Sequence, residues 1–298
     1  MVTGSWTIRS GSYAAAVDAV GASLRRLTLG GRDLVVPYRE GAVRPLFRGA
    51  IVAPWPNRVV DGRYRFEGRD YQLPLTEPDR GHALHGLVNW VRWEAVASGV
   101  DHVYLHHDLV PQDGYPFALA LDVEYVLSGD GLTARLTALN TGTHDAPYGC
   151  CPHPYLVAGA GRVDDWLLTV PATTVLDTRE RLIPTTLRPV AELGLGFDRR
   201  RVGPISADNA FTGLRRSPDG AASVRVEAAA GTGVEISWGT WASWVQVHTA
   251  DRPEPENDRV GLAIEPMSCP PDAFNSGADL VVLAPGQEHM AKWTIRGW

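Results

Sequence analysis

The chain alternates hydrophobic and polar side chains over many short stretches. The clearest case is ALALDVEYVLS (118–128), in which every second side chain from Leu119 to Leu127 is apolar and Asp122 and Glu124 fall between them. After Gly129-Asp130-Gly131, LTARLTALN (132–140) continues with the same period. A period of two is that of a strand, because successive side chains point to opposite faces. We therefore predict two adjacent antiparallel strands.

Turn signals separate further predicted strands. Gly30-Gly31, Asp61-Gly62 and Glu67-Gly68 each lie between short alternating runs. Such pairs favour hairpins, because both central residues of the turn take positive φ. Additional strands are predicted at 166–170, 222–228, 234–238, 244–248, 280–283 and 292–295. The pattern predicts an all-β fold, a large antiparallel β-sandwich, in a single domain over residues 1–298.

Composition narrows the possible classes of protein. Of the 298 residues 44% are hydrophobic and 21% charged, which is typical of a globular protein. The net charge of −6 and the presence of one lysine argue against nucleic acid as a partner. The sequence has neither a signal-peptide pattern nor a stretch of about 18 apolar residues, so we expect a cytoplasmic protein that does not contact membranes. Its three cysteines, Cys150, Cys151 and Cys269, are expected to be reduced packing residues.

A carboxylate stands out in the apolar stretch LAIEPMSCPPDAFN (262–275). Glu265 lies in a run that otherwise predicts a buried strand, and a glutamate is rarely buried unless it is paired or functional. Pro266 lacks an N–H for the sheet, so we expect the strand to end or bend there. Apolar neighbours raise the pKa of a carboxyl group towards the range of a general acid or base. The alternative is a glutamate in water on an edge strand.

A histidine lies between two prolines in PYGCCPHPYL (147–156). The prolines restrain the backbone of His153 and so give its side chain a defined direction. Histidine also has the unperturbed pKa that lies nearest physiological pH. His153 and Glu265 are therefore candidates for moving protons between two oxygen atoms. The alternative for His153 is a half-buried histidine bonded to a backbone carbonyl.

Two further segments, IVAPWPNRVVD and GHALHGLVNWVRW, are rich in side chains that suit sugars. Arg58 and His85 offer hydrogen bonds to hydroxyl groups, and Trp90 offers a flat face to C–H groups. His82 and His85 also form an HxxH pair, but no carboxylate or thiol follows at ligand spacing, so we predict no metal site. The alternatives are a surface ion pair for Arg58, a turn cap for His85 and a core position for Trp90.

Five stretches together resemble one family. APWPNR, HALHGL, the PHPY motif, LAIEPMSCPPDAFNSG and LAPGQEH are similar, in this order, to the aldose 1-epimerases or galactose mutarotases. The EPM and CPPDAFN signatures resemble a bacterial subgroup. The resemblance extends nearly from end to end of the chain. It implies a β-sandwich of the galactose mutarotase-like type with an open cleft, no metal and no organic cofactor.

The resemblance also assigns roles to residues. Glu265 matches the catalytic base of the family and His153 its catalytic acid. The positions that match substrate-contacting residues are Arg58, His85, Asp208 in SADNAFTGL and Gln246 in WVQVHT. Val247-His248 stands where Tyr-Thr is common, so this chain departs from the family beside Gln246. For Asp208 the alternative is a residue that starts a turn.

These roles imply an aldose 1-epimerase that interconverts the α and β anomers of a free monosaccharide such as galactose or glucose. Glu265 would take the proton of the anomeric hydroxyl while His153 gives one to the ring oxygen, which opens the ring. This requires an ionised Glu265 beside a charged His153 and predicts a bell-shaped pH profile. We expect a monomer or homodimer whose partner is the sugar alone.

Three alternatives remain open from the sequence. Glycoside hydrolysis would use Asp208 and Glu265 as its two carboxylates and would leave His153 without a role. A non-catalytic sugar-binding module would keep the cleft without the chemistry. An epimerase of an anionic sugar, phosphorylated or sulfonated, would need extra cations at the cleft. The candidates for these cations are Arg92, Arg215 and Arg216.

Overall fold

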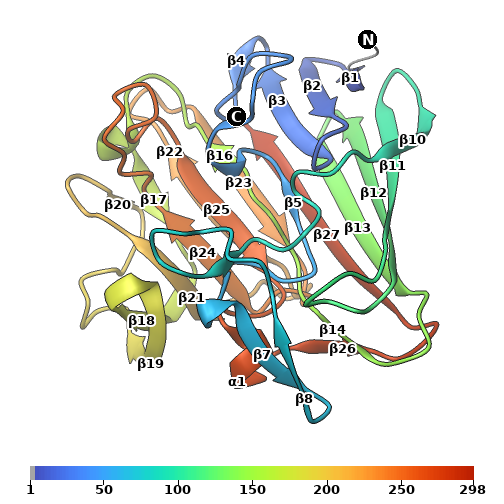
Figure 1. Cartoon of the computed structure of the whole chain (residues 1–298). Helices are drawn as coiled ribbons and strands as arrows, with labels where there is room; N and C mark the ends of the chain where they lie inside the picture. The colour runs from blue at the N-terminus through green and yellow to red at the C-terminus, as the bar shows by residue number, and fades with distance from the viewer. Residues whose placement is uncertain (1–3) are drawn as a thin grey trace.

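The computed structural model describes residues 4–298 (Figure 1). Its largest sheet is antiparallel and has nine strands. In spatial order these are β10 (Glu94–Ser98), β11 (His102–Leu109), β12 (Leu119–Ser128), β13 (Gly131–Asn140), β27 (Glu288–Gly297), β23 (Gly233–Trp238), β22 (Ala222–Glu227), β17 (Leu167–Thr169) and β20 (Arg200–Arg201).

A second antiparallel sheet has six strands. In spatial order these are β16 (Tyr155–Leu156), β25 (Leu262–Met267), β24 (Trp244–His248), β21 (Asp208–Leu214), β18 (Ala172–Arg179) and β19 (Ile183–Pro189). The register of its central strands sets Gln246 opposite Glu265 and Asp208 opposite His248. Strand pairing alone therefore brings three of the predicted site residues together.

Smaller elements complete the chain. A four-stranded sheet, at the top of the view in Figure 1, contains β1 (Ser5–Ser10), β2 (Tyr13–Asp18), β3 (Ser23–Leu29) and β4 (Arg32–Asp33). The two-stranded pairs are β14 (Ala146–Tyr148) with β26 (Val281–Leu283), β15 (Cys151–Pro152) with β5 (Ile51–Val52), β6 (Arg58–Val59) with β9 (Ala83–Leu84), and β7 (Arg63–Phe66) with β8 (Arg69–Gln72). The helical segments are η1 (Pro45–Phe47), η2 (Val60–Gly62), η3 (Val163–Asp165), η4 (Glu180–Leu182) and α1 (Ala273–Ser276). Among residues 4–298, no helix has the length and apolar character that crossing a membrane requires.

One cluster of contacting buried side chains extends from Ile8 to Ile295 and includes residues of both large sheets. In β12 and β13 the alternate side chains that the sequence predicts as core are buried, from Leu119 to Leu127 and from Leu132 to Asn140. The predicted all-β antiparallel sandwich is confirmed. The shared core also supports one domain, which remains a proposal; residues 1–3 of its predicted range lie outside the described residues.

The predicted turns and strand ends are confirmed in part. Gly30-Gly31 joins β3 to β4 and Glu67-Gly68 joins β7 to β8, with positive φ at all four residues. The hairpin predicted at Asp61-Gly62 is wrong, because these residues join β6 to β7, which pair with other strands. Strand β25 also continues through Pro266 to Met267. The missing N–H of Pro266 is tolerated there, since β16 pairs only with Leu262 and Ala263.

Candidate active site

A cleft of about 370 Å³ lies on the outer face of the six-stranded sheet. In β25 and β24 the side chains of Ile264, Val245 and Val247 belong to the core, so Glu265 and Gln246 point to the opposite face. The cleft brings together six of the seven residues predicted for the site: Arg58, His85, His153, Asp208, Gln246 and Glu265.

Glu265 and His153 contact each other in the cleft. His153 Nε2 lies 3.3 Å from Glu265 Oε1. The residues are 4% and 2% exposed respectively, so the alternative of an edge-strand glutamate in water is wrong. Strand β16 begins two residues after His153 and pairs with β25, the strand that carries Glu265. This pairing brings the two side chains close together.

Burial determines the protonation of this pair. It raises the pKa of Glu265 well above its ordinary value, and the nearby charge of Asp208 adds to the shift. Burial also lowers the pKa of His153 to about 3. Burial therefore favours the uncharged form of each group, a protonated carboxyl beside a neutral imidazole. The sequence instead predicts an ionised Glu265 beside a charged His153, a state that burial opposes because each charge loses its hydration.

A buried thiol contacts the second oxygen of Glu265. Cys151 Sγ lies 3.7 Å from Glu265 Oε2, and burial raises the pKa of this thiol well above its ordinary value. The thiol therefore stays protonated and can donate to the carboxyl group. All three cysteines are free and buried, as the sequence predicts.

His85 lies against His153, with the two ring centroids 4.9 Å apart and the rings edge to face. Its own backbone has a φ of 60°, and its N–H donates to Asn57 O at 2.8 Å. The next residue, Gly86, must be glycine, because a Cβ at this position would lie 2.0 Å from Ala53 O. Burial, and next the proximity of His153, lowers the pKa of His85 well below its ordinary value, so His85 is neutral.

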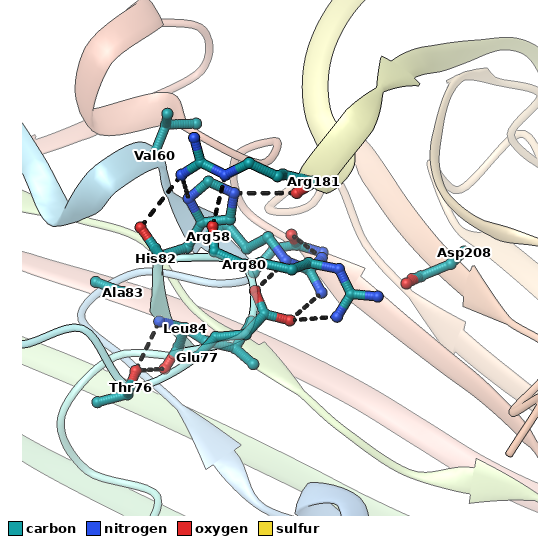
Figure 2. Close-up of polar contacts among 12 residues, drawn as sticks. Arg58, Val60, Thr76, Glu77, Arg80, His82, Ala83, Leu84, Arg181 and Asp208 are labelled. Carbon is teal, nitrogen blue, oxygen red and sulfur yellow. Dashed lines mark hydrogen bonds and ion pairs between the residues drawn. The ribbon is translucent and has the colours of Figure 1, made fainter. Parts of the chain in front are cut away.

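Arg58 is held by a carboxylate that the sequence did not single out. Glu77 accepts hydrogen bonds from Arg58 Nε at 2.7 Å and Nη2 at 2.9 Å, and from Arg80 Nη1 at 2.9 Å. Figure 2 shows the hydrogen bonds of Glu77 to both arginines, with Asp208 beyond their guanidinium groups in this view. Arg58 is 8% exposed, so it is not the surface ion pair considered as an alternative. The two-point contact fixes the direction of its guanidinium group.

We expect Glu77→Gln to raise KM by about 10-fold and to change kcat by less than about 3-fold, because Arg58 loses its two-point anchor but the acid–base pair is untouched. Steady-state kinetics with the best sugar measures both constants. The matched control is Glu192→Gln, which removes an exposed pair with Arg188. An unchanged KM in a folded Glu77→Gln protein would contradict this role for Glu77.

Asp208 and Gln246 form the polar side of the cleft opposite the arginines. Gln246 Nε2 donates to Asp208 Oδ1 at 2.7 Å. Burial opposes the charge of Asp208, but His248 and Arg58 together hold its pKa below the ordinary value. Asp208 is the first residue of β21 rather than the start of a turn. It is therefore an ionised acceptor inside the cleft.

Within the described residues, four buried polar atoms of the cleft lining have no hydrogen-bond partner in the protein. They are His85 Nδ1, His153 Nδ1, Gln246 Oε1 and Arg252 Nε. A buried polar group without a partner costs about 1–3 kcal/mol. A ligand rich in hydroxyl groups would supply both donors and acceptors for such atoms.

The HxxH pair does not form a metal site. Both ring nitrogens of the fully buried His82 contact backbone atoms, Asp61 N at 3.1 Å and Arg181 O at 3.0 Å (Figure 2). His82 thus ties the loop after β6 to η4. Within residues 4–298, ligand atoms of His85, His153 and Glu265 lie within 4.8 Å of one another, so these three residues are the set that could hold a metal ion.

The structure does not bring Trp90 into the cleft. Its ring lies beside a separate hollow, is 52% exposed and is covered by Arg44 at 4.4 Å from its centroid. The cations suggested for an anionic sugar also lie elsewhere. Arg92 lines the same hollow as Trp90, Arg215 lines another, and Arg216 donates to backbone carbonyl groups.

Backbone strain is concentrated around the cleft. Of the fourteen residues other than glycine that have positive φ in the described chain, five line the cleft: Leu46, Phe47, Asn57, His85 and Leu182. Such conformations are unfavourable for these residue types and persist where the surroundings impose them, often at functional sites. This observation, independent of charge, supports the cleft as the candidate functional site.

Sequence reasoning missed several residues that line the cleft. They are Phe47, Glu77, Arg80, His248 and Arg252. Only His248 had a signal, namely its departure from the Tyr-Thr of the family. The others lie in loops or turns, where neither periodicity nor spacing predicts contacts.

Fold and site together define an all-β protein whose polar cleft is built around a buried carboxyl–imidazole pair, on a sandwich of the galactose mutarotase-like type. Residues 4–296 match the model of the aldose 1-epimerase family, and the chain belongs to this family.

Similar proteins agree with this assignment. The uncharacterized protein YihR of Escherichia coli K12 is 36% identical over 293 residues, which cover 98% of this chain and 92% of YihR. Galactose mutarotase of Rattus norvegicus is 32% identical over 164 residues, 53% of this chain and 46% of the rat protein. A GalM/aldose epimerase homologue of C. elegans has a TM-score of 0.87 at 20% identity, covering 100% of this chain and 99% of that protein, which shows a shared fold.

Proposed function

We propose that this protein is an aldose 1-epimerase that interconverts the α and β anomers of a free aldose, with Glu265 and His153 as the groups that move protons. The observation that carries the proposal is the 3.3 Å contact between these two buried side chains inside a polar cleft. A module that only bound sugar would not need to bury a carboxyl group beside an imidazole, since that arrangement costs stability.

The pair carries one exchangeable proton, and this number is conserved through the reaction. Moving that proton from Glu265 to His153 across their contact gives an ionised base and a charged acid. Glu265 then takes the proton of the anomeric hydroxyl while His153 gives its proton to the ring oxygen. The bond between the anomeric carbon and the ring oxygen breaks, and an aldehyde forms.

Reclosure completes the cycle. Rotation about the bond between the aldehyde carbon and its neighbour presents the other carbonyl face to the same hydroxyl group. Closure with the proton roles reversed gives the other anomer and leaves an ionised Glu265 beside a charged His153. Return of the proton from His153 to Glu265 restores the starting pair. Arg58, His85, Asp208 and Gln246 are proposed to hold the remaining hydroxyl groups, with Arg58 donating and Asp208 accepting.

The decisive experiment follows freshly dissolved α-anomers of galactose, glucose and other aldoses to equilibrium, by polarimetry or proton NMR in weak buffer. Acceleration over buffer that scales with protein concentration supports the proposal and ranks the sugars. Binding without acceleration would favour a sugar-binding module instead. Release of an aryl leaving group from a glycoside would favour hydrolysis by Asp208 and Glu265, a reading that gives His153 no role.

We expect a bell-shaped dependence of kcat/KM on pH, because only the pair with one proton has both an acid and an acceptor. As pH falls through the lowered pKa of His153, about 3, a second proton fills the acceptor. As pH rises through the raised pKa of Glu265, the last proton is lost. The acid limb should therefore lie well below the ordinary histidine pKa. Initial rates across pH, within the range where the protein stays folded, measure both limbs. An acid limb centred near 6.5 would contradict the lowered pKa of His153.

A second candidate is an epimerase of a sugar that bears an acidic group. The observation that favours it is Arg252, which lines the cleft and whose Nη2 lies 3.3 Å from His248 Nε2. No carboxylate of residues 4–298 pairs with this guanidinium, whereas Arg58 and Arg80 share Glu77. Including a 6-phosphorylated and a 6-sulfonated hexose in the panel separates the candidates, since preference for either over the neutral sugar would favour the second.

A further inference from the structure

The turn that carries Leu46 and Phe47 is strained where it meets the cleft. Both residues line the cleft, and their φ angles are 51° and 58°. Two consecutive bulky side chains in the left-handed region do not adopt this conformation by local preference. Contacts from the surrounding structure must impose it.

Arg44, the residue before η1, ties the start of this turn to neighbouring segments of the chain. It is 5% exposed, and its Nη atoms donate to Val20 O at 3.2 Å, Ser23 Oγ at 2.5 Å and Asn89 O at 2.6 Å. Its guanidinium group also lies over the ring of Trp90. No carboxylate of residues 4–298 forms an ion pair with Arg44. Its Nη donors bond to Val20, Ser23 and Asn89, while its buried Nε has no hydrogen-bond partner. Arg44 thus acts as an anchor for these segments rather than as the partner of a carboxylate.

The ring of Phe47 lies against His85 and His153. Its centroid is 4.8 Å from that of His85, 6.0 Å from that of His153 and 6.3 Å from that of Trp90. The segment after the turn also pairs with the backbone of His153, because Gly49 N donates to His153 O at 2.8 Å. The position of Phe47 is therefore fixed relative to the acid–base pair.

Phe47 also offers the exposed aromatic face that the cleft otherwise lacks. Phe47 and Tyr155 are the two carbocyclic rings among the lining residues of the described chain, and Tyr155 is 2% exposed. Phe47 is half-buried. Small-ligand sites combine apolar or aromatic surface with a few placed polar groups. The C–H groups on one face of a sugar ring need such a surface, while its hydroxyl groups need Arg58 and Asp208.

We propose that Phe47 is a substrate-contacting residue on which the sugar ring rests, and that Arg44 is the positioning residue that holds Phe47 in place, with Trp90 packed behind both. Phe47, rather than Trp90, would then provide the aromatic surface for the C–H groups of the sugar. The proposal rests on the proposed function and extends it to residues outside the acid–base pair.

The first test compares Phe47→Ala with Phe47→Tyr. Phe47→Ala should raise KM by about 10-fold with kcat changed less than about 3-fold, and Phe47→Tyr should restore most of the affinity because it keeps the ring. The matched control is Val43→Ala, in the same segment but 83% exposed and outside the cleft. An unchanged KM in Phe47→Ala, or the same loss in Phe47→Tyr, overturns the role of Phe47.

The second test asks whether Arg44 acts through Phe47. Arg44→Lys keeps the charge but loses the branched donors, and should raise KM. The double variant Arg44→Lys/Phe47→Ala should have the KM of Phe47→Ala alone, because residues that act through one contact are not additive. If the increases in KM of the two single variants multiply in the double variant, the positioning role of Arg44 is overturned. If Arg44→Lys does not fold, Trp90→Phe can replace it, because it alters the packing of Arg44 but keeps its hydrogen bonds. Its KM is then compared alone and in combination with Phe47→Ala.

Direct binding separates this proposal from the proposed function. The dissociation constant of the sugar, followed by ligand-observed NMR, should rise in Phe47→Ala as KM does. A wild type that binds a sugar without epimerising it, and loses that binding in Phe47→Ala, supports Phe47 while the proposed function fails. A wild type that neither binds nor epimerises any sugar overturns both.

Discussion

Glu265→Gln is expected to lower kcat by about 10³-fold or more in a protein that stays folded. The amide has nearly the size and shape of the carboxyl group, but it can neither take up a proton nor hold the one that the pair shares. A positioned acid or base typically contributes about 10²–10⁴-fold, and here the loss also removes the proton source for His153. Anomer interconversion measured at saturating sugar gives the change in kcat.

The same substitution should stabilise the fold. The pKa of Glu265 is raised in the folded protein, so the folded state holds a proton that the unfolded chain releases above its ordinary pKa of 4.5. Stability of the wild type therefore falls as pH rises from 4.5 towards the raised pKa, and glutamine removes this dependence. Thermal unfolding at about pH 5 and about pH 8 should show a melting temperature advantage for Glu265→Gln that grows with pH.

Glu235→Gln is the matched control, because Glu235 is another buried glutamate, on β23, and pairs with Arg296 outside the cleft. It should keep kcat. If Glu265→Gln retained more than about a tenth of the wild-type kcat, proton transfer by this residue would be excluded.

The parts of the site that the sequence predicts well are those where one residue breaks a strong local pattern. Glu265 stands in an apolar run, and His153 stands between prolines. Strand alternation then fixes which side of the sheet each residue faces. Where β24 pairs with β25, this alternation puts Gln246 and Glu265 on the same face of the sheet, but the pairing itself was not predicted from the sequence.

The residues that sequence reasoning missed depend on tertiary contacts instead. Glu77 lies in a loop, and nothing in its neighbourhood predicts that it bridges Arg58 and Arg80. Phe47 lies in a turn whose left-handed residues, Leu46 and Phe47, are not glycine, and no turn rule places such residues. Trp90, the more conspicuous aromatic residue, lies behind it and outside the cleft.

Protonation could not be predicted either. The sequence suggests opposite charges that support each other, but the pKa values depend on how completely both groups lose water. Burial of both Glu265 and His153 favours the neutral pair. In the proposed mechanism, the charged forms of the two groups are therefore generated by proton transfer within the cleft.

His153→Asn tests this transfer directly and is expected to lower kcat by about 10³-fold, because asparagine fills much of the imidazole volume but cannot carry the proton to the ring oxygen. The residual rate should have a different pH dependence. With Glu265 as the remaining titrating group, activity should rise with pH along a single limb as the carboxyl group ionises, in place of the bell. Initial rates across pH measure both changes, and His106→Asn, an exposed histidine on β11 that pairs with Asp122, should leave them unaltered.

The double variant His153→Asn/Glu265→Gln completes this test. If one proton shuttles between the two groups, removing either disables the same step, and the double variant should be about as slow as the slower single variant. Losses that multiply would mean that each residue acts on the sugar independently, and a residual bell-shaped profile in His153→Asn would place the second titrating group elsewhere. The 3.3 Å contact favours the shared proton, because two groups so close in a buried site cannot change protonation independently.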